Sequence, residues 1–228
     1  RSDAEYVVIA PAHFIMAIDY RDVLAKHIES KAEITLVYHP ANNAKHHFIG
    51  SDIITLDEEG LVKEFTPNKG AANKANISLE AYVINRAKFI ELMEKAEKIS
   101  SFFGLRDVIA YTVGRTERVH SYAFTDYVRC FDTLEHYIEY SMELLDYTVR
   151  AQLFKPDWPI YTVTHDTPPA RYLKTADVKN SFVANGAEIE GTVRNSILAR
   201  NVKIGKNTKV TNSIILSGTE VGEGIEIE

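Results

Sequence analysis

The stretch LARNVKIGKNTKVTNSIIL, residues 198–216, decides the fold of the second half of this 228-residue chain. Apolar residues recur at every sixth position, at Leu198, Ile204, Val210 and Leu216, with glycine and asparagine between them. Strands this short cannot bury an apolar face alone, so successive coils must stack on one another. The pattern predicts a left-handed parallel β-helix of hexapeptide repeats, with short antiparallel strands joined by glycine turns as the alternative.

Two further apolar pairs extend this pattern in both directions. Val183 and Ile189 precede the stretch, and Val221 and Ile227 follow it, each pair six residues apart but shifted in phase. We therefore assign residues 177–228 to the β-helix, which we expect to be incomplete because the chain ends within a repeat. Residues 151–176 are expected to form an extended linker, because their prolines resist helix formation.

The first 150 residues show an α/β pattern. The ranges 6–10 and 33–38 are predicted strands, and the helix between them, over 20–30, has Asp19 as its cap. Further on, the sequence predicts a hairpin over 51–65 and an amphipathic helix over 86–99. The chain starts without methionine and directly before a buried strand, so we expect this domain to be partial.

The composition narrows the class of function. The net charge is −6, which argues against a nucleic-acid partner. No apolar run approaches the length of about 20 residues that a membrane helix needs. The single cysteine, Cys130, excludes an internal disulfide and fits a cytoplasmic location.

Local motifs along the whole chain resemble the glucose-1-phosphate adenylyltransferases. The order and spacing of the motifs match, although no single one is decisive. The matching segments are His13 to Tyr20, Leu61 to Phe65, Ser78 to Ile84, Tyr127 to Glu135, and Trp158-Pro159-Ile160 followed by Pro168-Pro169-Ala170. The resemblance implies a Rossmann-like nucleotidyltransferase domain with a mixed sheet, followed by the β-helix.

This family joins glucose 1-phosphate to ATP with Mg²⁺ held by two aspartates. His13 and Cys130 stand at those two positions, and neutral imidazole and thiol are poor Mg²⁺ ligands. Asn68 stands where the family has a sugar-phosphate lysine, and Glu80 stands where it has a glycine. The resemblance implies that no catalytic or metal-binding residue remains and that Mg²⁺ is not bound.

A retained sugar-phosphate pocket is still implied at Ser78, Tyr82 and Arg129. The chain therefore resembles a GlgD-type regulatory subunit, weakly active or inactive itself, which pairs with a catalytic GlgC-type subunit in glycogen biosynthesis. Glucose 1-phosphate, ATP or a phosphorylated-sugar effector are its expected ligands. The alternatives are an active sugar-1-phosphate nucleotidyltransferase and a scaffold subunit without a ligand. A hexapeptide acyltransferase is disfavoured because residues 177–228 contain no histidine.

Overall fold

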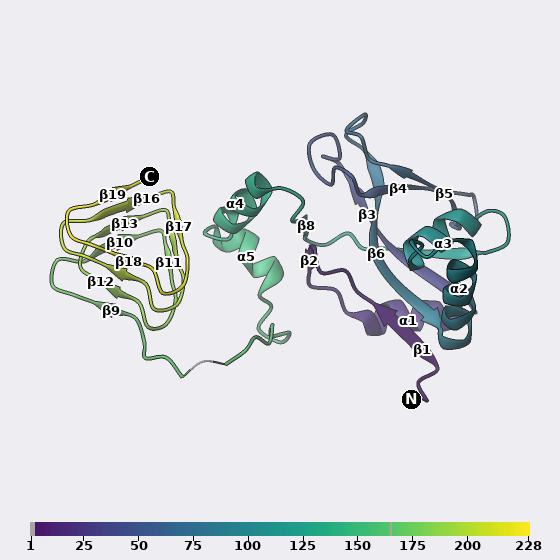
Figure 1. Cartoon of the computed structure of the whole chain (residues 1–228), viewed down its shortest axis with the longest axis horizontal. Coiled ribbons are helices and arrows are strands. Elements are labelled where there is room, and N and C mark those ends of the chain that lie inside the picture. The colour runs from purple at the N-terminus through teal and green to yellow at the C-terminus, as the bar shows by residue number, and fades with distance from the viewer. Residues whose placement is uncertain (1–2, 165) are drawn as a thin grey trace. The chain divides into compact units, whose positions relative to one another are not determined.

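A computed structural model describes residues 3–164 and 166–228 of the chain (Figure 1). The chain divides into two compact units, residues 1–132 and 133–228, which we call the α/β unit and the β-helix unit. Among the described residues, the helices are too short or too polar to cross a bilayer.

The α/β unit contains eight strands and three helices within its described part. The strands are β1 (Tyr6–Ile9), β2 (Phe14–Met16), β3 (Ile34–Ala41), β4 (Asp52–Leu56), β5 (Val62–Pro67), β6 (Ala75–Asn85), β7 (Val119–Ala123) and β8 (Val128–Cys130). The helices are α1 (Tyr20–Glu29), α2 (Arg86–Ile99) and α3 (Leu105–Thr112). Asp19 caps α1 as predicted, because its side chain accepts a hydrogen bond from the Arg21 backbone amide.

The main sheet is mixed and has the strand order β5-β4-β6-β3-β7. The long strand β6 is its centre, and it pairs antiparallel with β1, β3 and β4. Only β3 and β7 are parallel among the paired strands of this sheet. A bulge interrupts β6, because Val37 pairs with Ala81 and Tyr38 with Ser78, which leaves two extra residues between them.

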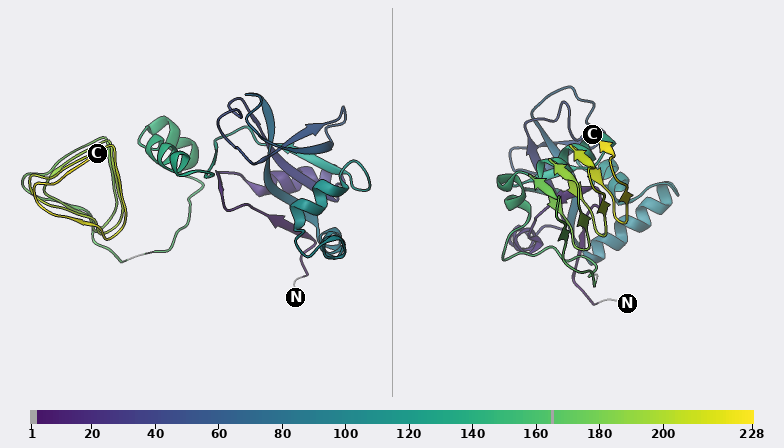
Figure 2. Two further views of the ribbon diagram at one scale, coloured as in Figure 1. Left: turned by 45° about the horizontal axis from the view of Figure 1, so that its top comes forward. Right: turned by 90° about the vertical axis from the view of Figure 1, so that its left-hand side faces the viewer.

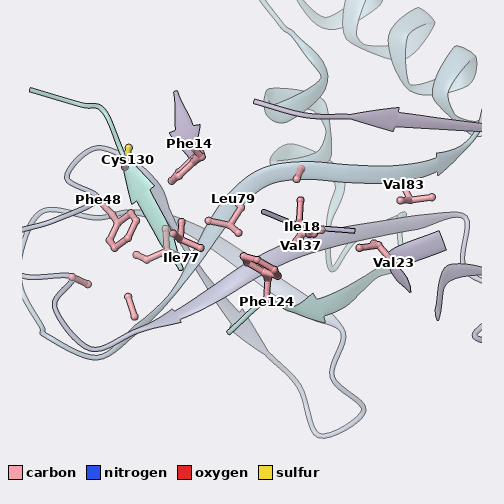
Figure 3. Packing of buried hydrophobic residues seen from close by; sticks show 14 residues of the cluster. Phe14, Ile18, Val23, Val37, Phe48, Ile77, Leu79, Val83, Phe124 and Cys130 are labelled. Carbon is pink, nitrogen blue, oxygen red and sulfur yellow. The ribbon is translucent and has the colours of Figure 1, made fainter. Parts of the chain in front are cut away.

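Apolar side chains cover both faces of this sheet. One cluster joins α1 to the sheet through Val23 and includes Phe14, Phe48 and Cys130 (Figure 3). The other cluster joins α2 and α3 to the opposite face through residues such as Leu92 and Ile109. The unit is therefore a sheet between two helical layers, as a Rossmann-like α/β fold requires.

The β-helix unit begins with two short helices, α4 (Leu134–Glu143) and α5 (Tyr147–Leu153). Three parallel sheets follow, and Figure 2 shows them as the sides of a triangular coil. Their strands are β9 (Arg171–Tyr172), β10 (Asp177–Lys179), β11 (Phe182–Val183), β12 (Glu188–Ile189), β13 (Thr192–Arg194), β14 (Ile197–Leu198), β15 (Lys203–Ile204), β16 (Lys209–Thr211), β17 (Ile214–Ile215), β18 (Glu220–Val221) and β19 (Glu226–Ile227). The predicted parallel β-helix is confirmed.

The predicted spacing of six holds on only some sides of the coil. Val178 pairs with Val193 and Val193 with Val210, which gives coils of 15 and 17 residues. Consequently the prediction that Leu216 points inward is wrong: Leu216 is 62% exposed, and Ile215 is buried in its place.

A corner made of an asparagine and a serine explains why the inward residue is Ile215 rather than Leu216. Asn180, Asn195 and Asn212 each adopt a left-handed backbone conformation, with φ between 45° and 49°. Such a residue turns the chain sharply, so the next inward residue follows five positions after the last one. Each asparagine is followed by a serine, and the Ser181 and Ser196 hydroxyls accept from the backbone amide of the serine in the next coil.

The three outer faces of the coil differ in chemistry. The face formed by β9, β12, β15 and β18 pairs opposite charges, such as Arg171 with Glu188 and Lys203 with Glu220. The face formed by β11, β14 and β17 presents Phe182, Ile197 and Ile214, all half-buried. The third face again carries charged residues on strands β10, β13, β16 and β19.

This apolar face borders a groove within the β-helix unit. The groove has a volume of about 620 Å³ and is also lined by residues of α4 and α5, including Tyr137, Leu144 and Phe154. The sequence predicts that the apolar stripe of α4 is core, and this is wrong for much of it. Leu134, Tyr137 and Ile138 are exposed, and Tyr140 is the residue of α4 that is buried.

Candidate functional site

His13 and Cys130, which the family resemblance predicts to replace two metal-binding aspartates, lie directly before β2 and at the end of β8 in the α/β unit. Strands β2 and β8 pair antiparallel, with Phe14 opposite Cys130. The ladder continues one step further, because the Phe131 amide donates to the His13 carbonyl at 2.9 Å. The tertiary structure thus joins His13 to Phe131, 118 positions later (131 minus 13), and Cys130 lies opposite Phe14.

Cys130 is a buried thiol in a mainly apolar setting. It is 1% exposed and belongs to the same cluster as Phe14 and Phe48, which Figure 3 shows around the end of β8. Burial, followed by the negative charge of Asp132, raises the pKa of Cys130 to about 12. The raised pKa disfavours the thiolate at neutral pH, and with it the use of Cys130 as a nucleophile.

His13 offers no better metal site. Its ring packs on the neighbouring Phe14 ring, with 4.4 Å between the centroids. Mg²⁺ binds carboxylate and other oxygen ligands, whereas this pair of positions supplies an imidazole and a protonated thiol. The residues present here do not fit the Mg²⁺ ion that the family resemblance implies.

Ser78 and Tyr82, the predicted sugar-phosphate residues, lie inside β6. Ser78 is fully buried, and its hydroxyl accepts from the Glu80 amide at 3.3 Å. Tyr82 is 2% exposed and packs in the apolar cluster under α2 and α3. Its hydroxyl has no hydrogen-bond partner in the described part of the chain. Burial, together with the negative charges of Glu80 and Asp52, raises the pKa of Tyr82.

Arg129, the third predicted residue, lies on β8 directly before Cys130 and pairs with Ile15 on β2. Its guanidinium donates to the Val128 carbonyl at 2.9 Å and lies 4.5 Å from the centre of the Tyr127 ring. Arg129 is half-buried, so it is more accessible than Ser78 or Tyr82. The binding roles of these three residues stay predictions.

Asn68, where the resemblance predicts a lost sugar-phosphate lysine, has a structural role. It is 1% exposed, and its amide nitrogen donates to the carbonyls of Ala44, His47 and Phe48. Its amide oxygen accepts from the Gly70 backbone amide at 3.0 Å. Because these bonds use the whole side-chain amide to hold the loop before β4, Asn68 has no group left for a phosphate.

Sequence reasoning missed an ion pair close to these positions. Arg106, near the start of α3, donates two hydrogen bonds to the buried carboxylate of Asp52, at 2.7 and 2.8 Å. Glu80 lies 3.7 Å from the same guanidinium, with its backbone in a left-handed conformation at the bulge of β6. No motif marks Asp52 or Arg106, because they are 54 residues apart and only the fold pairs them.

The fold places the chain in the class of proteins in which an α/β domain precedes a hexapeptide β-helix. A family model described as the GlmU-like, C-terminal hexapeptide matches residues 168–228. This match agrees with the coils that the structure shows.

Curated relatives are similar over nearly the whole chain. A protein named glucose-1-phosphate adenylyltransferase from Clostridium perfringens (strain 13) is 28% identical over 97% of this chain and 56% of its own length. Proteins of the same name from Bacillus cytotoxicus and Deinococcus radiodurans are 29% and 28% identical, over 98% and 96% of this chain. The chain covers 60% and 59% of those two relatives, so it spans little more than half of the proteins it matches.

Proposed function

We propose that this chain is a regulatory subunit of a glucose-1-phosphate adenylyltransferase, acting in the cytoplasm with a catalytic subunit that supplies ADP-glucose for glycogen synthesis. One observation carries the proposal: His13, directly before β2, and Cys130, on β8, supply an imidazole and a buried thiol where the family resemblance implies two metal-binding carboxylates. Phosphoryl transfer depends on neutralising charge around the transferred group, and these two side chains cannot position Mg²⁺ for it.

The immediate surroundings support the same proposal. Asn68, in place of a lysine, donates its side-chain amide to backbone carbonyls of a loop. Glu80, in place of a glycine, adds a carboxylate that would repel a sugar phosphate. Each change removes attraction for an anionic substrate, so we expect little or no transfer by this chain itself.

The apolar face of β11, β14 and β17 supports a subunit partner. Phe182, Ile197 and Ile214 are apolar where the other two faces carry charges, and the groove beside them is open. Tyr137 and Phe154, which line the same groove, are exposed, and exposed apolar patches mark interaction surfaces in soluble proteins. We place the contact with the catalytic subunit on this face.

The test is co-purification of this chain with a catalytic subunit, followed by kinetics of the catalytic subunit with and without the chain. We expect a stable complex and a changed response to effectors. An unchanged rate and effector response in a confirmed complex would rule out the regulatory role. Efficient ADP-glucose synthesis by this chain alone would contradict the proposed inactivity.

Two matched variants test the contact surface. Ile197→Glu places a charge in the apolar face and should abolish co-purification, whereas Thr192→Glu places the same charge on a neighbouring outward face and should leave it intact. Circular dichroism of both variants checks that the coil is folded. Equal binding by the two variants would show that the subunit contact is not on this apolar face.

A further inference from the structure

A polar hollow lies in the α/β unit, at the end of α3 away from Arg106. It has a volume of about 450 Å³ and lies between the loop 113–118 and the start of β5. We call it the loop groove, and its charged lining residues are Asp57, Lys63, Arg115, Glu117 and Arg118. Because α3 has eight residues, the loop groove lies roughly 12 Å along the helix axis from the Asp52–Arg106 pair.

The two carboxylates of the loop groove are already satisfied. Glu117 is 7% exposed and receives the ammonium groups of Lys88 at 2.6 Å and Lys95 at 3.5 Å. Asp57 closes the hairpin turn, where its side chain accepts from the backbone amides of Glu59 and Leu61. Both carboxylates are held by other partners, and the lining carries three cations against these two acids.

The three cations are weakly paired or unpaired. Lys63 has no side-chain hydrogen bond or ion pair within residues 3–164 and 166–228, and it is exposed. Arg115 lies over the Tyr111 ring, 5.1 Å from its centre. Arg118 reaches Glu59 at 3.3 Å, but both side chains are more than 70% exposed, so this pair has little strength.

A neighbouring histidine reports the positive charge of this region. His120 lines an adjacent hollow that it shares with Lys31 and Arg118. Burial, and then the positive charge of Arg118, lowers the pKa of His120. Arg118 thus contributes a positive charge next to His120, in a hollow that Glu33 also lines.

The sequence pointed to another group of cations for an anionic ligand, namely Lys69, Lys74 and Arg86. The structure separates them, because Lys74 directly precedes β6 and Arg86 directly follows it. An 11-residue strand spans roughly 35 Å, so these side chains do not form one site.

We propose that the loop groove binds a small phosphate-bearing anion through Lys63, Arg115 and Arg118. Guanidinium groups bind phosphate oxygens with two parallel hydrogen bonds, and the lysine adds a compact positive charge. The volume suits a metabolite rather than a polymer. This inference stands apart from the proposed function, because it concerns binding by the chain alone and needs no catalytic partner.

The experiment is isothermal titration calorimetry of the whole chain with inorganic phosphate, pyrophosphate and a hexose bisphosphate, in parallel with citrate. We expect saturable binding of at least one phosphate compound, weakened by added salt. The three phosphate titrations distinguish a free phosphate from a phosphorylated sugar. Tighter binding of citrate than of all three, or no saturable binding of any of them, would overturn the proposal.

Two double variants locate the site. Lys63→Gln with Arg118→Gln should weaken binding about tenfold or more, because it removes two charge-assisted contacts. Lys174→Gln with Lys206→Gln removes the same charge from exposed lysines of the β-helix unit and should leave the affinity within about twofold. Equal weakening in both would show an unspecific charge effect and would overturn the site.

A third variant separates the loop groove from the predicted sugar-phosphate residues. Arg129→Gln removes the cation of that region, so any binding that it abolishes belongs there, whereas binding at the loop groove should remain. Loss of binding in Arg129→Gln, with retention in the Lys63→Gln and Arg118→Gln variant, would assign the anion to the region of Ser78 and Arg129 and would refute the loop groove. Thermal unfolding of each variant confirms that it is folded.

Discussion

The two units bury their apolar residues with contacts of very different reach along the chain. In the α/β unit Ile34 pairs with Val119, 85 residues later (119 minus 34), and that pairing completes the sheet. In the β-helix unit each strand pairs with one that is 15 or 17 residues away, such as Val178 with Val193. A coil therefore depends on its two neighbours alone, whereas the sheet forms only when distant segments have met.

The largest effect is expected from a cavity in the α/β unit. Leu92 on α2 is fully buried in the cluster beneath the helices, so Leu92→Ala should lower the free energy of unfolding by about 3 to 4 kcal/mol. Urea unfolding followed by circular dichroism measures the change. Glu94→Ala, at an exposed position of the same helix, should leave stability within about 0.5 kcal/mol. Similar losses in the two variants would contradict the assigned core.

A smaller loss is expected where successive coils touch. A Cβ atom on Gly191 would meet the backbone of the next coil, at Thr208 and, 2.8 Å away, at the Gly205 carbonyl oxygen. Gly191→Ala should therefore destabilise the β-helix by about 2 kcal/mol through overpacking.

Gly222 provides the matched control, because a Cβ there meets no atom within 4 Å. Gly222→Ala should be close to neutral in the same thermal unfolding measurement. Equal melting temperatures for both alanine variants would show that the coils are spaced more widely than the structure indicates. Contacts between neighbouring coils would then not be what stabilises the β-helix unit.

Substitutions at the Asn-Ser corner should change the stability of the β-helix by a still smaller amount. Asn195 has φ 45°, and its side-chain oxygen accepts from Asn180 at 2.9 Å. Asn195→Ala should cost about 1 kcal/mol, because alanine resists the left-handed conformation. Asn195→Gly should recover most of that loss, since glycine adopts this conformation freely. An alanine variant as stable as the glycine variant would refute the backbone explanation.

The smallest effect is expected from the charged face of the coil. Lys203 pairs with Glu220 at 2.6 Å, but both side chains are more than half exposed. Lys203→Gln should leave the melting temperature almost unchanged, with an even smaller shift in high salt, because water screens this exposed pair. A fall in melting temperature as large as that of Gly191→Ala would show that this ladder stabilises the coil as strongly as its buried residues do.

Sequence reasoning succeeded where the responsible interactions are local. The cap at Asp19, the helix over 86–99 and the hairpin with Gly60 at φ 81° are all present, because each depends on neighbours within a few residues. It failed at Leu216, since a strict count of six ignored the left-handed asparagines. The repeats V-K-N-S-F-V, V-R-N-S-I-L and V-T-N-S-I-I, which start at residues 178, 193 and 210, were the available signal.

The helix stripes show a second limit. Periodicity predicts that Ile28 and Ile90 face inward with their neighbours, yet both are about half exposed. In α1 and α2 the buried stripe is narrower than the apolar pattern, and it centres on Val23 with His27 and on Leu92 with Ala96. Period alone does not fix how wide a contact the sheet offers to each helix.

In the candidate site, too, some features follow from the local sequence and others from contacts between distant segments. The sequence alone determined which chemical groups are present: an imidazole at His13, a thiol at Cys130 and an amide at Asn68. It also determined the coil of the β-helix, because every coil repeats a short pattern and contacts its neighbours in the chain. The tertiary structure decided that β2 pairs with β8, that Cys130 is buried, and that Asp52 meets Arg106. These features depend on strands and helices separated by 50 residues or more, whose pairing is set by the packing of the whole sheet rather than by any local pattern.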